Sequence, residues 1–297
     1  MSRLLRVLAL ALLLLSRTAD AVSVSDQAGR RLDLPGLPER IISLVPSVTE
    51  ILFAIGAQDR LVGVTDFCDY PAEARRKPSV GGMLAPSLET MVALKPDLVV
   101  ATTSGNRHET FDQLARLEVP VFVVNPVTVA DVLDLLSRLG RLTARVDAAG
   151  RLVSALRERI RAVSARVAGR ARPRVLYVLW PDPLIVPARG ALVTELIALA
   201  GGDSVTADGG QGYPRYSMEA ALARNPEVII LASHGSSPSP LVRAQWERFG
   251  QVPAIAAGRL HTMDGNLMHR YGPRMVDGLE QLARLIHPGA FDKAAAR

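Results

Sequence analysis

The side chains that most often perform catalysis are few in this chain and show no catalytic spacing. The five histidines lie singly, outside any H-E-x-x-H zinc motif. The sequence has no G-x-S-x-G turn and no phosphate-binding loop, which are common signatures of hydrolases and nucleotide-dependent enzymes. Cys68 is the single cysteine, so it forms no internal disulfide and is either packed in the interior or a soft metal ligand. We therefore expect a binding protein and not an enzyme.

Two glutamates occupy equivalent places in a motif that recurs at a constant offset of 130 residues. Glu89 belongs to the copy SLETMVALKPDLVV at 87–100, and Glu219 belongs to SMEAALARNPEVII at 217–230. Each copy predicts a serine-capped helix, a turn marked by proline and a buried strand of β-branched residues. Glutamate in the first helical turn is favoured by the helix dipole. The repeat predicts two lobes built alike.

Between the two copies, residues 144–168 have the pattern of one long helix. Apolar residues recur every three or four positions, at Val146, Ala149, Leu152 or Val153, Leu156, Ile160, Val163 and Val167. Eight charged residues occupy the other face, and Gly169 and Pro173 end the run. About 24 residues at about 1.5 Å each give a rod of roughly 36 Å, enough to connect two small lobes.

Short apolar runs alternate with helical segments on both sides of this helix. Strands are expected at 41–45, 61–64, 98–101, 119–124, 174–179, 228–231 and 260–263, and further helices at 46–55, 108–117, 128–139, 194–200 and 273–286. This alternation predicts an α/β fold of two similar lobes with mainly parallel sheets, joined by one long helix. Ser47 and Glu50 have the spacing of a capping box. The polar, proline-rich residues 22–40 are expected to be an irregular lead-in.

The first 21 residues have the features of a cleavable secretory signal. Arg3 and Arg6 precede an apolar run at 7–15, and Ala19 and Ala21 form a small-x-small cleavage site. The run is too short for a permanent membrane span. The expected parts are a signal peptide at 1–21, an N-terminal lobe at 22–126, a helical segment at 127–172 and a C-terminal lobe at 173–297.

Composition indicates a globular chain and does not favour nucleic acid as a partner. The 297 residues are 48% hydrophobic and 22% charged, ordinary proportions for a packed protein. The net charge is +6, but the arginines are spread along predicted helices without basic blocks interleaved with aromatics. A solvated basic surface accounts for this charge.

Residues 39–47, ERIISLVPS, resemble the opening of the periplasmic binding proteins whose two lobes are joined by one long helix. The similarity continues through 94–100, 195–202 and 213–214 and covers nearly the whole mature chain. Within that group, VTEIL at 48–52 and FCDYP at 67–71 are most similar to the cobalamin-binding branch. The resemblance implies a periplasmic monomer without a resident cofactor that delivers a metal chelate to an ABC permease and its ATPase.

The resemblance also implies a ligand held between the lobes by loops. A corrin is broad, largely apolar and rimmed by amides, so aromatic faces with a few polar groups suit it. The implied contacts are Phe67, Tyr70, Met83, Trp180, Tyr213, Tyr216, Asp264, Asn266 and Arg270. Met83 and Thr102 stand where cobalamin-binding relatives carry large aromatics. Tyr70 either contacts ligand or packs its loop against its own lobe.

Haem is the alternative ligand, with Tyr70, Tyr213 or His269 as the iron ligand. A ferric siderophore is a further alternative within the same fold. For Glu89 and Glu219 the resemblance implies a second role beside the helix dipole. Paired acids of this kind face the permease and meet its arginines, so that the loaded protein docks by matched charge.

Overall fold

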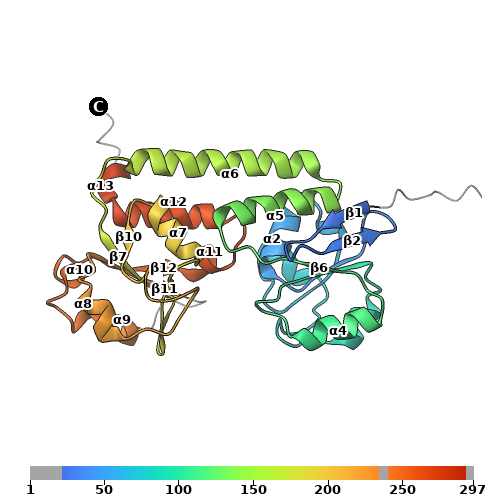
Figure 1. Ribbon diagram of the computed structural model, residues 1–297, viewed down its shortest axis with the longest axis horizontal. Helices are drawn as coiled ribbons and strands as arrows, with labels where there is room; N and C mark the ends of the chain where they lie inside the picture. Colours follow the sequence, from blue (N-terminus) through green and yellow to red (C-terminus); the bar gives the residue numbers. More distant parts are fainter. Residues whose placement is uncertain (1–21, 234–239, 292–297) are drawn as a thin grey trace, which may run out of the picture.

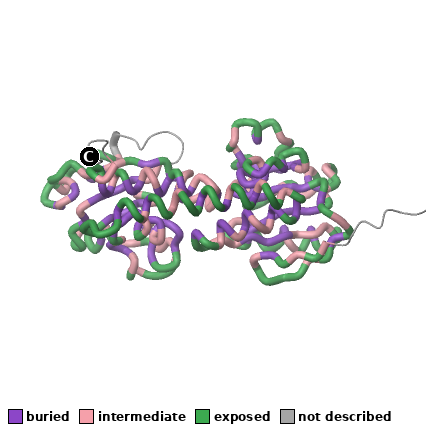
Figure 2. The backbone as a smooth tube through the Cα atoms, turned by 90° about the horizontal axis from the view of Figure 1, so that it is seen from above, coloured by how far each residue is buried: buried purple, intermediate pink, exposed green. Residues whose placement is uncertain are grey.

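The computed structural model describes residues 22–233 and 240–291, and the predicted signal peptide lies outside these ranges. Two lobes lie side by side, and one long helix, α6 (Val146–Val167), runs along both of them (Figure 1). Viewed from above, each lobe has buried residues at its centre (Figure 2). Among the described residues, no helix combines the length and the apolar character needed to cross a bilayer.

The N-terminal lobe is built on a four-stranded parallel sheet. Its strand order is β4 (Leu61–Val64), β3 (Ile41–Ser43), β5 (Leu98–Ala101) and β6 (Val121–Val123). Alternate residues of each strand point to opposite faces. One face packs with α2 (Pro46–Ala54) and α5 (Val129–Leu142), and the other with α3 (Leu88–Ala93) and α4 (His108–Arg116). The strands are therefore buried on both sides and consist almost entirely of aliphatic residues.

The C-terminal lobe repeats this plan. Its sheet has the order β10 (Asp203–Ser204), β7 (Arg174–Val178), β11 (Val228–Ser233) and β12 (Leu260–Asp264), all parallel. The inner face packs with α7 (Leu192–Leu199) and α12 (Met275–Ile286). The outer face packs with α8 (Met218–Ala223), α9 (Pro240–Glu247) and α10 (Pro253–Ala256). Shorter elements are β8 (Trp180–Pro181), β9 (Leu184–Ile185), α11 (Gly265–His269) and α13 (Pro288–Phe291).

Helix α6 lies over a hydrophobic core that is continuous between the lobes. Buried residues of α2 and α5 belong to the same cluster as those of α7 and α12. At the N-terminal end of α6, a Cβ on Gly140 of α5 would come within 2.5 Å of the Ala149 Cβ, so the two helices touch closely there. Further along, the Arg159 guanidinium binds Asp277 at 2.6 Å and Glu280 at 2.8 Å on α12. The predicted helix is confirmed, but Val146 is 57% exposed and does not join the predicted apolar face.

The internal repeat is confirmed in the capping of the equivalent helices. The Ser87 hydroxyl accepts from the backbone N–H of Thr90, and the Ser217 hydroxyl accepts from that of Ala220, both at 3.2 Å. These contacts satisfy orphan N–H groups at the starts of α3 and α8. The two helices therefore begin by the same local chemistry in both lobes.

The repeat extends to the turns that follow these helices. Lys95 and Asn225, again 130 residues apart, have positive φ angles of 47° and 49°. In each case an arginine at the start of a neighbouring strand donates its Nε–H to the turn carbonyl at 2.9 Å, Arg40 to Lys95 and Arg174 to Asn225. The same side-chain clamp thus holds both left-handed turns.

Two local predictions are wrong. The segment at 22–40, expected to be an irregular lead-in, contains an antiparallel hairpin of β1 (Val22–Ser25) and β2 (Arg31–Leu34). The backbone N–H of Gln27, which follows β1, donates a hydrogen bond to the Val123 carbonyl of the edge strand β6. The hairpin covers an edge that would otherwise present unpaired backbone groups. At the start of α2, Val45 is the N-cap without a side-chain cap, so the expected capping box is absent. The Glu50 carboxylate instead accepts hydrogen bonds from a side chain of the C-terminal lobe.

Candidate functional site

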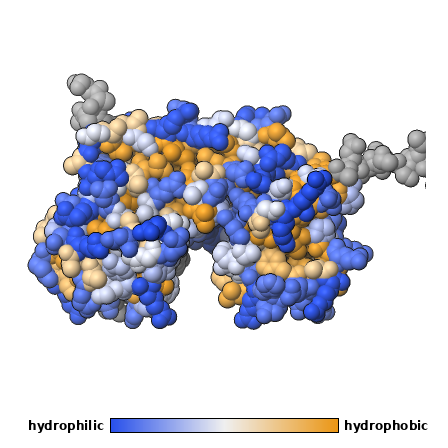
Figure 3. All heavy atoms as spheres, viewed as in Figure 1, coloured by the Kyte–Doolittle hydropathy of each residue, from blue (hydrophilic) through white to orange (hydrophobic). Residues whose placement is uncertain are grey.

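The molecule is hollowed between its lobes on the side opposite α6 (Figure 3). The loop after β4 and the segment after β12 come together at this boundary, because Asp69 of the first and Arg270 of the second form an ion pair at 2.5 Å. Both segments follow the carboxyl ends of parallel strands. Ligands of open α/β sheets usually bind at such edges.

Three predicted contact residues present aromatic side chains to solvent. Phe67 is 57% exposed, Tyr70 45% and Trp180 46%, and they are the aromatic members of the exposed large hydrophobic set among the described residues. Phe67 and Tyr70 follow β4 in the N-terminal lobe, and Trp180 follows β7 in the C-terminal lobe. The Trp180 indole N–H donates to the Asp182 carbonyl at 2.9 Å, which orients the ring. Each lobe thus offers an apolar face near the ends of its strands.

A cluster of four charged side chains, Glu50, Asp69, Arg270 and Arg274, crosses the lobe boundary. The Glu50 carboxylate, 3% exposed, accepts two hydrogen bonds from the Arg274 guanidinium at 2.9 and 2.6 Å. Arg270 lies 3.7 Å from Glu50 and bonds to Asp69. Both acids come from the N-terminal lobe and both arginines from the C-terminal lobe. The cluster is neutral as a whole, which reduces the cost of burying its members.

Tyr70 and the charged cluster are in direct contact. The Arg274 guanidinium carbon lies 3.7 Å from the centre of the Tyr70 ring, a cation–π arrangement. Burial alone would raise the pKa of Asp69, but the hydrogen bond and charge of Arg270 outweigh it and hold that pKa below its usual value. For Arg274, burial lowers the pKa, and the carboxylate of Glu50 more than reverses the effect. All three groups are therefore held in place by contacts across the boundary or within the loop.

The candidate iron ligands of the C-terminal lobe already have hydrogen-bond partners. The Tyr213 hydroxyl lies 2.9 Å from the Tyr271 hydroxyl, and His269 Nε2 lies 3.0 Å from the Tyr177 hydroxyl. Burial raises the pKa of Tyr213, which disfavours the phenolate form that coordinates ferric iron. These side chains form a partly buried aromatic group beside the cleft.

The other predicted contacts lie on loops or helix starts with local partners. Asp264 caps α11 by accepting the N–H of Asn266, whose side-chain oxygen accepts from Arg270. Met83 packs against the turn at 102–106, where Thr102 is buried and bonds to Asn125. Tyr216 lies against Gly209 and the outer core of its own lobe. The structure joins Asn266 and Arg270 to the charged cluster, while Met83 and Tyr216 contact their own lobes.

Cys68 is packed in the interior. Its side chain is 2% exposed, and its sulfur lies 3.3 Å from the Thr65 hydroxyl. Among the described residues, no three His, Cys, Asp or Glu side chains gather in a way that could hold a metal ion. The packed alternative for Cys68 fits this placement.

Glu89 and Glu219 are both exposed at the starts of equivalent helices, α3 and α8. The Ser217 hydroxyl donates to Glu219 at 2.6 Å and lowers the pKa of that carboxyl. Both acids are therefore available to solvent on separate lobes.

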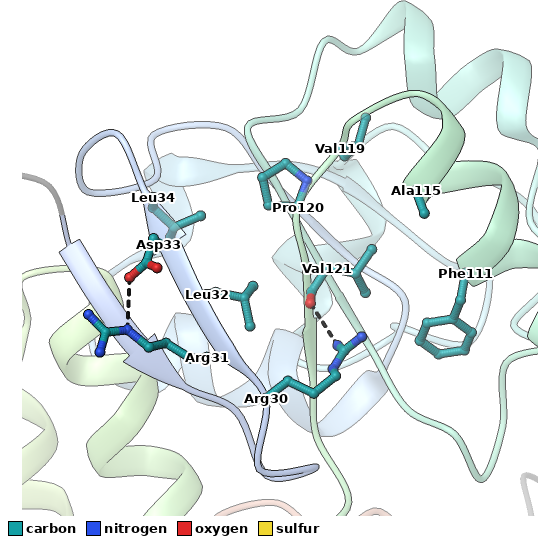
Figure 4. A pocket seen from close by; sticks show the side chains of 10 residues that line it. All are labelled: Arg30, Arg31, Leu32, Asp33, Leu34, Phe111, Ala115, Val119, Pro120 and Val121. Atoms are coloured by element: carbon teal, nitrogen blue, oxygen red, sulfur yellow. Dashed lines mark hydrogen bonds and ion pairs between the residues drawn. The ribbon is translucent and has the colours of Figure 1, made fainter.

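A hollow of about 280 Å³ lies on the N-terminal lobe, away from these residues (Figure 4). Apolar side chains of β2, α4 and the chain leading into β6 line it, and the Arg30 guanidinium closes one side by donating to the Val121 carbonyl at 2.9 Å. None of the predicted contact residues lines it. It belongs to the protected edge of the sheet.

Sequence reasoning missed the charged cluster, apart from Arg270. Glu50 was explained by a local capping pattern, whereas its partner Arg274 is 224 residues away. Asp69 lies inside FCDYP, which resembles the cobalamin-binding branch of the family. In that motif, however, the predicted ligand contacts are the aromatic residues Phe67 and Tyr70. Arg270 and Arg274 lie close together in the sequence, on the segment that joins α11 to α12, and this spacing is the one signal of a shared anionic partner.

Comparisons with known proteins agree with this architecture. A family model described as "Periplasmic binding protein" matches residues 41–267. A vitamin B12-binding protein of Salmonella typhimurium is 31% identical over 247 residues, covering 83% of this chain and 90% of that protein. The crystal structure of the periplasmic vitamin B12 binding protein BtuF of Vibrio cholerae matches with a TM-score of 0.75 at 26% identity, over 86% of this chain and 99% of that one.

Similarity extends equally to a haem-binding protein. A periplasmic heme binding protein from Pseudomonas aeruginosa matches with a TM-score of 0.74 at 26% identity, over 85% of this chain and 94% of that one. The predicted fold, two similar lobes with mainly parallel sheets and one connecting helix, is confirmed by these likenesses and by the sheets themselves. The backbone alone does not separate the two kinds of ligand.

Proposed function

The chain belongs to the periplasmic binding protein family, and on that premise we propose that it is the substrate-binding component of an ABC importer for cobalamin or a related corrinoid. In this proposal the signal peptide at 1–21 directs export to the periplasm, and the mature chain begins near Val22. The monomer captures its ligand unchanged between the lobes and delivers it to the permease and its ATPase. It catalyses no reaction.

The observation that carries the ligand assignment is the set of exposed aromatics, Phe67, Tyr70 and Trp180, contributed by both lobes. Only 4% of the chain is aromatic, so three exposed rings at the ends of strands are unusual. Aromatic faces leave water favourably when they cover the broad, largely apolar surface of a corrin. The amide rim of such a ligand matches the donors of Arg270 and Asn266 and the carboxylate of Asp264.

Haem is the second candidate, supported by the haem-binding protein of similar fold. Tyr70 is the best placed iron ligand because it is 45% exposed, whereas Tyr213 and His269 are hydrogen-bonded and partly buried. The Arg274 guanidinium covers one face of the Tyr70 ring and does not by itself decide between the two ligands. We favour cobalamin because a relative that is 31% identical over 83% of this chain is a vitamin B12-binding protein.

Titration of the purified protein with cyanocobalamin and, separately, with haemin tests the assignment by visible spectroscopy. We expect saturable, stoichiometric binding of cyanocobalamin, recovered chemically unchanged. Phe67→Ala and Trp180→Ala should each weaken binding about tenfold or more, as buried aromatic anchors do at interfaces. Leu117→Ala removes a side chain that is 45% exposed at the end of α4 and serves as the control with unchanged affinity. Tight binding of haemin without cyanocobalamin would favour the alternative.

A further inference from the structure

The four-charge cluster is segregated by lobe in a way that local packing does not require. Glu50 and Asp69 belong to the N-terminal lobe, and Arg270 and Arg274 belong to the C-terminal lobe. Arg75 of the N-terminal lobe also lies 3.6 Å from Asp69, whereas the cations that pair with Glu50 both come from the C-terminal lobe. Separation of the lobes would break the contacts of the Glu50 carboxylate with Arg270 and Arg274. Removal of one partner while the lobes stay together would leave a charge unpaired in a buried position, which is strongly unfavourable.

The geometry links Glu50 to the candidate ligand contacts through the two arginines. Arg274 makes a two-point contact with Glu50 and carries the Tyr70 ring on its face at 3.7 Å. Arg270 lies 3.7 Å from the same carboxylate. A planar guanidinium held at two points has little freedom to turn, so the ring stacked on it is oriented as well. Glu50 touches neither the exposed face of Tyr70 nor the space between the lobes, since it is buried.

The backbone fits closely around the same carboxylate. A Cβ on Gly272, between the two arginines, would lie 3.3 Å from Glu50 Oε2 and 3.7 Å from the Ser47 Cβ. The segment joining α11 to α12 therefore passes directly over the start of α2. Few alternative lobe positions preserve both this contact and the ion pairs.

We propose that Glu50 is a positioning residue: it holds Arg270 and Arg274 across the lobe boundary, fixing the relative placement of the lobes and the orientation of Tyr70 before ligand arrives. Its connection to ligand affinity rests on the proposed function, but its effect on lobe placement does not. Preorganisation of this kind lowers the cost of binding.

Pulsed double electron–electron resonance on the spin-labelled, ligand-free protein tests the relative placement of the two lobes directly. Spin labels on Gln113→Cys in α4 and Ala223→Cys in α8, both exposed sites, report the distance between lobes in a Cys68→Ala background. Glu50→Gln keeps the side-chain shape and removes its charge, and we expect a broader or displaced distance distribution. Asp277→Asn, which removes a carboxylate from the Arg159 pair beneath α6, is the matched control and should leave the distribution unchanged.

Arg274→Lys provides a second variant if Glu50→Gln yields too little folded protein. Lysine keeps the charge but loses the two-point contact, so it should also broaden the distribution. The double variant Glu50→Gln with Arg274→Gln should be no worse than either single variant, because both act through one contact. A folded Glu50→Gln protein with the parent distribution would overturn the proposal, whatever ligand is bound.

Cyanocobalamin titration of the same variants tests the link to binding. If the competent lobe placement falls to about a tenth of the population, the apparent affinity falls about tenfold. Broadened distances with unchanged affinity would overturn the preorganisation part of the proposal. Broadened distances in a protein whose parent binds no cyanocobalamin would leave the positioning role supported and instead contradict the proposed ligand.

Discussion

At the scale of single residues, the fate of Glu50 shows what a local pattern can and cannot predict. Ser47 and Glu50 have the correct spacing for a capping box, but the helix begins with Pro46. Proline has no backbone N–H that needs a hydrogen-bond partner at this position. The two-point contact with Arg274 is charge-assisted and stronger than a backbone cap. The sequence near Glu50 gives no indication of its ion pair with Arg274, so that pair could be found only from the tertiary fold.

The exposed aromatics were more accessible to sequence reasoning than the charges. Phe67, Tyr70 and Trp180 are apolar residues in segments without helical or strand periodicity, so a role outside the core was the natural interpretation. Tyr213 and Tyr216 have the same sequence character but lie partly within their own lobe. A loop position alone does not reveal which way its side chain points.

His287 provides a prediction about pH. Burial lowers its pKa, outweighing the hydrogen bond between Nε2 and the Gly201 carbonyl at 3.1 Å. The unfolded chain therefore takes up the proton first as the pH falls through the usual histidine value of 6.5. The contribution of neutral His287 to folding is present above that value and is lost progressively below it.

Urea unfolding at pH 7.5 and at pH 5 should show this loss in the parent. His287→Asn, which does not titrate, should show a flatter dependence of the unfolding free energy on pH. His108→Asn, on an exposed helix start, should retain the parental dependence. An identical slope in the parent and in His287→Asn would contradict the assignment.

At the scale of elements, helix and strand positions could be predicted wherever packing follows periodicity. Strands 61–64 and 98–101 are observed as predicted, because their aliphatic runs are buried on both faces. Helix α6 differs by two residues at one end and one at the other. The hairpin of β1 and β2 escaped prediction although its strands, VSVS and RLDL, alternate apolar and polar residues, because each alternation lasts only four residues inside a polar, proline-rich segment.

The contact between α5 and α6 predicts opposite effects for two glycine substitutions. Gly150→Ala on α6 adds a Cβ to open space and should raise the unfolding free energy by up to about 1 kcal/mol through helix propensity. Gly140→Ala gains the same propensity but drives its Cβ to 2.5 Å from the Ala149 Cβ. We expect a net loss of about 1–3 kcal/mol from this overpacking.

Urea denaturation measures both changes. Ala149→Gly in the Gly140→Ala background removes the opposing Cβ and should recover part of the loss. If Gly140→Ala proves as stabilising as Gly150→Ala, then the two helices are further apart than the structure places them.

At the scale of the whole molecule, the paired glutamates predict a separation between ligand binding and uptake. Glu89→Ala with Glu219→Ala removes one exposed acid from each lobe, and exposed helix-start carboxylates contribute little to folding. Cobalamin affinity should stay within about twofold of the parent, a difference below about 0.5 kcal/mol. Each acid that pairs with a desolvated permease arginine should cost about 2–5 kcal/mol of docking free energy when removed.

Uptake by proteoliposomes that contain the permease and ATPase measures the docking effect. Asp147→Ala with Glu158→Ala removes two exposed acids from α6, on the opposite side of the molecule, and should leave uptake unchanged. Parental uptake by the Glu89/Glu219 double variant would exclude the docking role. A parallel fall in ligand affinity would indicate damage to the cleft instead.

The core that continues beneath α6 makes the two lobes one folding unit, although they look like separate bodies. Residues of α2 and α5 share a cluster with those of α7 and α12, so cutting the chain at the connecting helix would expose an apolar face on each half. Neither half would then be expected to remain soluble by itself. Heating should melt both lobes in a single cooperative transition, with the calorimetric and van't Hoff enthalpies in agreement. Although the two lobes are built alike, neither is therefore expected to fold independently of the other.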